Sequence, residues 1–313
     1  MTVATAPGKA ILFGEHAVVY GRPAIAVPVA EVQARAEVED APAGAGITIV
    51  ARDLGRTIHL RHVKPGDREA LALARTVRNA LERLGHRSEP DLHITISSSV
   101  PIGRGLGSGA AVATALVRAL TAHLGGYLTS REISDLVYQT EILHHGTPSG
   151  IDNTVIAFGK PIFFVKGQRD DVFWPGRPFW LVIGDTGVSS PTREVVADVR
   201  RGWEADPVGY EAHFDAIAAI VEDARRAIID GNLPALGRLM DDNQRELEAI
   251  GVSSPELETL IGAAREAGAL GAKLSGAGRG GNMIALVEDD TRGQVRLALM
   301  AAGARNVIVT RVS

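Results

Sequence analysis

Residues 100–111 read VPIGRGLGSGAA and connect the end of a predicted strand to the start of a predicted apolar helix. Glycines alternate along this stretch, at Gly103, Gly105, Gly107 and Gly109. Glycine lets backbone N–H groups approach an anion, and the N-terminus of the following helix adds a positive partial charge. The stretch therefore predicts a phosphate-binding loop. It is not a Walker A loop, since no Gly-Lys-Ser/Thr follows, and it is not a GxGxxG dinucleotide-binding fingerprint.

The elements on both sides of this loop predict an α+β protein. Hydrophobic periodicity predicts strands at 32–39, 47–50, 57–63, 92–100, 161–165 and 179–184. It predicts helices at 67–84, 107–124 and 129–144, of which the last opens with the capping box Thr129-x-x-Glu132. The second half is mostly helical, at 192–204, 209–230, 233–249 and 255–267, and it closes with strands at 271–274, 282–287 and 306–312 around a helix at 291–302.

The link from Trp174 to Pro178 separates these two halves. Long helices followed by a β-β-α-β order suggest a second α+β domain after the link. We therefore expect an N-terminal domain over 1–175, which carries the phosphate loop, and a C-terminal domain over 176–313.

Composition excludes several classes of protein. The chain has 313 residues, of which 45% are hydrophobic and 22% charged, as in a soluble globular protein. It has no cysteine, which removes disulfides, thiolate nucleophiles and cysteine-bound metals. The net charge of −4 argues against nucleic-acid and basic membrane-surface binding. No apolar run reaches the roughly 18 residues of a membrane span, and no signal peptide is recognisable, so a cytoplasmic location is expected.

A second motif, APGKAILFGEHAVVYG at 6–21, places a Lys, a Glu and a His within eight residues. A short apolar strand ends at Phe13, and Gly14 allows a bend after which Glu15 and His16 can point into a cleft. The alternative is a solvated Lys9 beside a surface turn, and the motif alone does not decide between the two.

Two further stretches combine charge with turn residues. Residues 141–153 read EILHHGTPSGIDN, in which Glu141 and Asp152 could act as a Mg²⁺ ligand and a base. Apolar neighbours favour a partly buried pair of carboxylates over two surface charges.

Residues 273–281, KLSGAGRGG, match GxGxxG, but a strand follows where that fingerprint needs a helix, so we expect a second anion- or substrate-facing loop. Only five lysines occur in the chain, and Lys9 and Lys273 lie in these motifs.

With motifs at 6–21, 100–111, 141–153 and 273–281 in this order, the sequence resembles the GHMP-type small-molecule kinases over nearly its whole length. Within them it is most similar to the mevalonate kinases, because of Gly14-Glu15-His16 and the turn Ser190-Pro-Thr-Arg193. The resemblance implies a two-domain α+β fold. The N-terminal domain would contain a left-handed β-α-β unit, and the C-terminal domain would be ferredoxin-like. It also implies phosphorylation of the 5-hydroxyl of mevalonate with ATP and Mg²⁺, in isoprenoid biosynthesis, by a possible homodimer.

The resemblance also implies a role for each motif residue. Asp152 would accept the hydroxyl proton, Lys9 would lower the hydroxyl pKa, and Glu141 would hold Mg²⁺. The ATP phosphates would contact the loop Gly103, Arg104, Gly105, Leu106, Gly107, Ser108 and Gly109. Mevalonate would contact Glu15, His16, Arg193, Gly276 and Ala277.

The sequence departs from the family pattern at two positions. Gly109 stands where the family commonly has the serine credited with a Mg²⁺ ligand, so either Ser108 or a water would take that place. Arg279 stands where the last loop commonly has a glycine.

The alternative function is that of another GHMP kinase, acting on phosphomevalonate or on another mevalonate hydroxyl.

Overall fold

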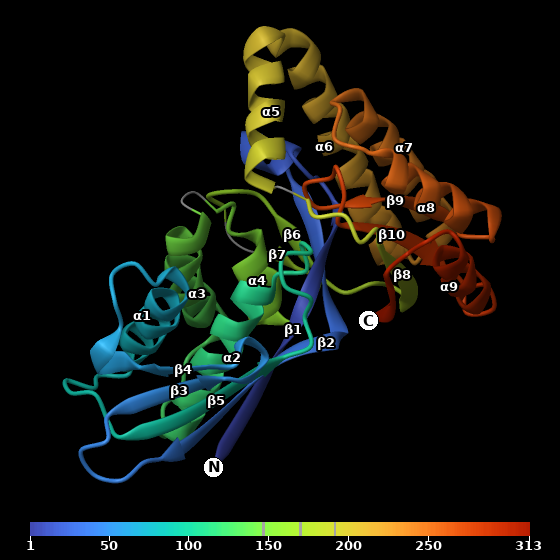
Figure 1. Ribbon diagram of the computed structural model, residues 1–313. Helices are drawn as coiled ribbons and strands as arrows, with labels where there is room; N and C mark the ends of the chain where they lie inside the picture. The colour runs from blue at the N-terminus through green and yellow to red at the C-terminus, as the bar shows by residue number, and fades with distance from the viewer. Residues whose placement is uncertain (146–147, 169–170, 191) are drawn as a thin grey trace. The chain divides into compact units, whose positions relative to one another are not determined.

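The computed structural model describes residues 1–145, 148–168, 171–190 and 192–313, and Figure 1 shows its ribbon. The chain forms two compact units. The first contains residues 1–8, 32–102 and 107–159, and the second contains residues 9–31, 103–106 and 160–313. Two long strands, β1 (Thr2–Phe13) and β2 (Ala24–Asp40), contribute residues to both units.

The first unit is a mixed sheet with helices. Its strands lie in the order β4-β3-β5-β2, with β3 parallel to β5 and the other pairs antiparallel. Alternate residues of β3 are buried, which is why its apolar positions recur with a period of two. Beyond β2, the elements are β3 (Ile47–Ala51), β4 (Arg56–His59), β5 (Leu92–Ser98), α1 (Arg68–Arg83), α2 (Ser108–His123), α3 (Ser130–His145) and α4 (Ile151–Phe158).

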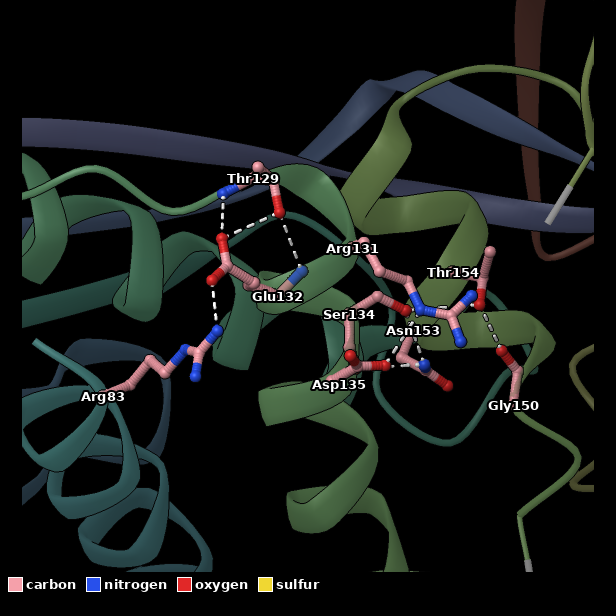
Figure 2. A network of polar contacts seen from close by, with 9 residues as sticks. All are labelled: Arg83, Thr129, Arg131, Glu132, Ser134, Asp135, Gly150, Asn153 and Thr154. Atoms are coloured by element: carbon pink, nitrogen blue, oxygen red, sulfur yellow. Dashed lines mark hydrogen bonds and ion pairs between the residues drawn. The ribbon is translucent and has the colours of Figure 1, made fainter. Parts of the chain in front are cut away.

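Polar contacts fix the start of α3 and the start of α4 (Figure 2). The Thr129 hydroxyl accepts from the Glu132 N–H at 3.2 Å, and Glu132 accepts from the Thr129 N–H at 2.9 Å, which confirms the capping box. In α4, the Asn153 amide donates to the Ser134 carbonyl at 3.1 Å and to the Ser134 hydroxyl at 2.8 Å. The first turn of α4 is therefore fastened to α3.

The second unit contains an antiparallel sheet in the order β11-β8-β10-β9. Its central strand β10 is buried at every position. The strands of this sheet are β8 (Phe179–Asp185), β9 (Gly271–Ser275), β10 (Asn282–Val287) and β11 (Asn306–Val312). The short strands β6 (Ile162–Phe164) and β7 (Asp171–Val172) belong to the other sheet, in which β6 pairs with residues 24–26 of β2. The helices are α5 (Thr192–Ala205), α6 (Pro207–Asp230), α7 (Leu233–Ala249), α8 (Pro255–Glu266) and α9 (Arg292–Ala301).

One mixed and one antiparallel sheet confirm the α+β prediction, and most elements lie within a few residues of their expected bounds. One expectation was wrong. The strand predicted over 57–63 ends at His59 and continues as a 3₁₀ turn over Leu60–His62. Helix α4, between Gly150 at φ 96° and Gly159 at φ 62°, was not predicted. Eight residues bounded by glycines carry too little periodicity to predict a helix.

Gly14 makes the bend that the sequence predicts after β1. Its φ is +94°, and a Cβ atom there would lie 2.5 Å from the Ala24 Cα. The short 3₁₀ helix Ala17–Tyr20 follows and ends at Gly21, where φ is +82° and a Cβ atom would meet nothing within 4 Å. Both glycines adopt a left-handed conformation. Of the two, only Gly14 also lacks space for a side chain.

We predict that Gly14→Ala lowers the free energy of unfolding by about 2 kcal/mol more than Gly21→Ala does. Both variants introduce backbone strain, and only the first adds a clash with backbone atoms. Urea unfolding of the two variants measures the difference. Equal losses would show that the contact with Ala24 does not hold the bend.

Candidate active site

A buried ion pair joins the second motif to strand β9 within the second unit. Lys273 and Glu15 are 0% and 1% exposed, and the Lys273 ammonium donates to Glu15 Oε1 in a short contact. The ammonium also donates to the Leu274 carbonyl at 2.6 Å. Burial raises the pKa of Glu15 and lowers the pKa of Lys273, and each shift is opposed by the charge of the partner.

Glu15 keeps one oxygen for another donor. Within the described part of the chain, the buried Oε2 atom has no hydrogen-bond partner, whereas Oε1 contacts Lys273. An unsatisfied carboxylate oxygen in the interior is costly unless a ligand supplies a hydrogen bond. A substrate hydroxyl is a donor of the required kind.

His16 stands next to this pair in an unusual backbone conformation, with φ 61°. Its Nε2 lies 2.9 Å from the Ala277 carbonyl oxygen. Since a carbonyl only accepts, Nε2 carries the proton of the neutral ring, and Nδ1 is left as an acceptor. Burial lowers the pKa of His16 to about 4, so the ring is neutral at physiological pH.

The loop 276–281 that contains Ala277 is held tightly. A Cβ atom on Gly278 would lie 2.0 Å from the Val252 carbonyl oxygen. The Ser190 hydroxyl donates to the Gly278 carbonyl at 2.6 Å, and the Gly281 N–H donates to the Val188 carbonyl at 2.9 Å. Gly276, at φ 96°, opens the loop directly after β9. This loop therefore contacts the segment that leads into α5, whose first turn carries Arg193 with an exposed side chain.

The division between the two units passes through the predicted phosphate loop, between Leu106 and Gly107. On the second-unit side, the Lys9 N–H donates to the Leu106 carbonyl at 3.0 Å. The Asn282 amide donates to the Arg104 carbonyl in a short contact, and Arg104 Nε lies 3.5 Å from Asp185 Oδ2. These contacts fix the backbone of the loop. Gly103 and Gly105 have φ angles of 70° and 76°, and a Cβ atom on either would meet nothing within 4 Å.

On the first-unit side, Gly107 caps helix α2 in a left-handed conformation, φ 73°, without any side-chain hydrogen bond at the cap. The N–H groups of the first turn, which begins at Ser108, therefore remain to be satisfied by an anion or water. Glu141 of α3 is buried, and its Oε1 lies 3.2 Å from the position that a Cβ atom on Gly109 would occupy. Glycine at 109 thus leaves space beside the carboxylate that a serine would fill.

These residues fit ATP and Mg²⁺. The backbone N–H groups of the glycine-rich loop and of the helix N-terminus are donors for phosphates, and Glu141 offers an oxygen ligand next to Gly109 in the first turn of α2. Among the described residues, no three His, Asp or Glu side chains cluster into a metal site of their own. Mg²⁺ does not need such a cluster, because it usually keeps several waters and binds one or two carboxylates plus substrate phosphates.

Asp152 lies in the first turn of α4 in the first unit, next to Asn153, which fastens that turn to α3 (Figure 2). Lys9 is buried in β1 in the second unit. The structure joins His16 to Ala277 by contact, and it sets Glu141 beside Gly109. Lys273, Asp185 and Asn282 are not among the predicted site residues. The signals for Lys273 were the scarcity of lysine in the chain and its place at the start of the motif 273–281.

Comparison with known proteins matches both halves of the chain. Residues 72–160 match the model of the GHMP kinases N-terminal domain, and residues 216–305 match that of the GHMP kinases C-terminal domain. Mevalonate kinases of Pyrococcus furiosus and Thermococcus onnurineus are 37% and 38% identical, over 98% and 99% of this chain and 95% and 96% of their own. The structure of L. major mevalonate kinase with R-mevalonate superimposes with a TM-score of 0.85 at 31% identity, covering 100% of this chain and 96% of that one.

The neutral state of His16 predicts a pH dependence of stability. The folded-state pKa is about 4, below the unfolded value of 6.5, so the unfolded state binds the proton more tightly. The contribution of His16 is fully present above pH 6.5 and is lost as the pH falls toward 4. Between pH 7 and 4.5, wild type should lose about 2.5 kcal/mol more of its unfolding free energy than His16→Gln. Urea unfolding at the two pH values measures this, and equal losses would refute a neutral buried ring.

Proposed function

Because the chain belongs to the GHMP kinases and, among them, to the mevalonate kinases, we propose that it transfers the γ-phosphoryl group of ATP to the 5-hydroxyl of mevalonate. The observation that carries this proposal is the buried cluster in which His16 meets Ala277 and Glu15 meets Lys273. It presents an unsatisfied carboxylate oxygen and an imidazole acceptor, and both suit a hydroxylated substrate.

Three side chains of the second unit bind the substrate in this proposal. Glu15 Oε2 accepts from one hydroxyl group, and His16 Nδ1 accepts from another. Arg193 pairs with the carboxylate, since a guanidinium matches a carboxylate with two parallel hydrogen bonds. A neutral His16 and a Glu15 that is paired with Lys273 favour hydroxyl groups of the substrate. Arg193 is then the residue that binds the negative charge of the substrate carboxylate.

The N–H groups of residues 103–109 and of the first turn of α2 would bind the phosphates of ATP. Glu141 would hold Mg²⁺, with Ser108 or a water in the place where the family commonly has a serine. The bound ion would neutralise charge on the phosphates. The space that Gly109 leaves beside Glu141 supports a water in that place.

Asp152 accepts the proton of the attacking hydroxyl, and Lys9 lowers the pKa of that hydroxyl. Phosphoryl transfer passes through a loose transition state, so the protein mainly positions the hydroxyl and balances charge. Asn153 supports this role because its two hydrogen bonds to Ser134 fix the turn that carries Asp152.

Among the helices of the described segments, none combines the length and the apolar character that a membrane span requires.

The function is tested by ADP release with mevalonate, phosphomevalonate, homoserine and galactose as acceptors. The proposal predicts the highest kcat/KM for mevalonate, and ³¹P NMR of the product should locate the phosphate on the 5-oxygen. The fold alone does not discriminate, since a phosphomevalonate kinase of Streptococcus pneumoniae superimposes with a TM-score of 0.83 at 16% identity. Preference for phosphomevalonate would overturn the assignment within the family.

Replacing the base should slow turnover. We predict that Asp152→Asn lowers kcat by at least about 100-fold while the KM for ATP stays within about twofold. The exposed carboxylate of Asp135, on α3 of the same unit, serves as a control, and Asp135→Asn should leave kcat unchanged. Wild-type turnover in Asp152→Asn would exclude Asp152 as the base.

Removing the guanidinium of Arg193 should weaken substrate binding. We predict that Arg193→Gln raises the KM for mevalonate by about tenfold or more, since a charge-assisted hydrogen bond contributes about 1.5–3 kcal/mol. Arg200 of the same helix is exposed and forms an ion pair with Glu204 one turn further on, so Arg200→Gln is the matched control. An unchanged KM in Arg193→Gln would show that the carboxylate binds elsewhere.

A further inference from the structure

Arg279 adopts a backbone conformation that disfavours any residue except glycine. Its φ is 54°, and among the described non-glycine residues only His16 shares a positive φ. A glycine, which the resemblance implies as the common residue here, would adopt this conformation without strain. Strain of this kind persists where the surrounding contacts impose it, and it concentrates at functional sites.

The side chain and backbone of Arg279 are held from three directions. Its N–H donates to the Val252 carbonyl at 2.8 Å, and Nε donates to the Gly251 carbonyl at 3.2 Å. The guanidinium donates through Nη1 to Asp198 Oδ2 in a short ion pair. This hydrogen bond lowers the pKa of Asp198, so the carboxylate is charged at neutral pH. Arg279 thus links the loop 276–281 to helix α5.

Helix α5 carries Arg193 in its first turn, and Asp198 lies five residues further on, about 7.5 Å along the axis. The last turn of α5 is anchored separately, since the Trp203 ring lies 5.6 Å from the Tyr20 ring. The segment before α5 contacts the loop through Ser190 and Gly278. The Asp198–Arg279 pair therefore joins the middle of α5, between its first and last turns, to the loop.

We propose that Arg279 is a positioning residue that holds α5 through Asp198, so that Arg193 meets a substrate carboxylate bound beside His16 and Ala277. All of these residues lie in the second unit. The inference rests on the proposed function in one respect, namely that Arg193 binds the carboxylate. The pair is too exposed to stabilise the fold strongly, with side chains 40% and 29% exposed, so its contribution is expected in binding.

The test compares Arg279→Gly, Asp198→Asn and the conservative Asp198→Glu. The first two should raise the KM for mevalonate about threefold to tenfold, with kcat and the KM for ATP within about twofold. Asp198→Glu should retain most of the wild-type KM. Arg279→Gly removes backbone strain as well as the ion pair, so its Tm should equal or exceed that of wild type. A purely structural role would instead lower Tm.

The matched control is Arg201→Gln. Arg201 also contacts Asp198, but from the same helix and with an exposed side chain, so its loss should leave the KM for mevalonate unchanged. Hydrogen exchange over residues 192–199 gives a readout that needs no substrate. Exchange there should be faster in Arg279→Gly and in Asp198→Asn, and unchanged in Arg201→Gln.

Each contrary outcome has a distinct meaning. A raised KM in Arg279→Gly with a wild-type KM in Asp198→Asn would overturn the link through Asp198. Unchanged exchange over 192–199 in both variants would overturn it without reference to any substrate. If Arg193→Gln itself leaves the KM for mevalonate unchanged, the carboxylate assignment fails first, and the positioning role fails with it. If Arg193→Gln raises the KM and Arg279→Gly does not, only the positioning role fails.

Discussion

The ion pair between Lys273 and Glu15 is the interaction on which the candidate substrate site depends. Two opposite charges with no exposure to solvent are tolerated only as a pair, because losing either leaves a buried charge without its partner. The pair therefore fixes the turn after Gly14 against strand β9. Strand β9 leads directly into the loop that contacts His16, so one electrostatic requirement sets the position of both candidate substrate-binding segments.

Backbone conformation provides the second constraint. The positive φ angles of His16 and Arg279 fall on the two segments that the ion pair brings together, and glycines with positive φ surround both. Such conformations are costly, and they persist because neighbouring contacts determine the backbone. Rigidity of this kind is useful in a kinase of this family, where positioning and charge balance account for most of the catalysis.

Much of the fold was predictable from the sequence, because long periodic segments such as α6 and buried strands such as β10 carry strong local signals. The capping box at Thr129 was predictable because its hydrogen bonds join two residues only three positions apart, Thr129 and Glu132. Helix α4 was not, since eight residues between glycines give little periodicity. The partner of Glu15 was not predictable either, because Lys273 lies 258 positions away along the chain and only the folded structure shows the pairing. The motifs thus predicted the candidate site residues, while the contacts that hold them required the structure.

A double-mutant cycle with Glu15→Gln and Lys273→Met tests the central claim most directly, with unfolding free energy and the KM for mevalonate measured for all four proteins. Each single variant should lose about 3–5 kcal/mol of stability, because it leaves a buried charge unpaired. The double variant should lose less than the sum, with a coupling energy above about 1 kcal/mol. Additive losses, or a wild-type KM for mevalonate in a folded double variant, would contradict the claim that this pair organises the site.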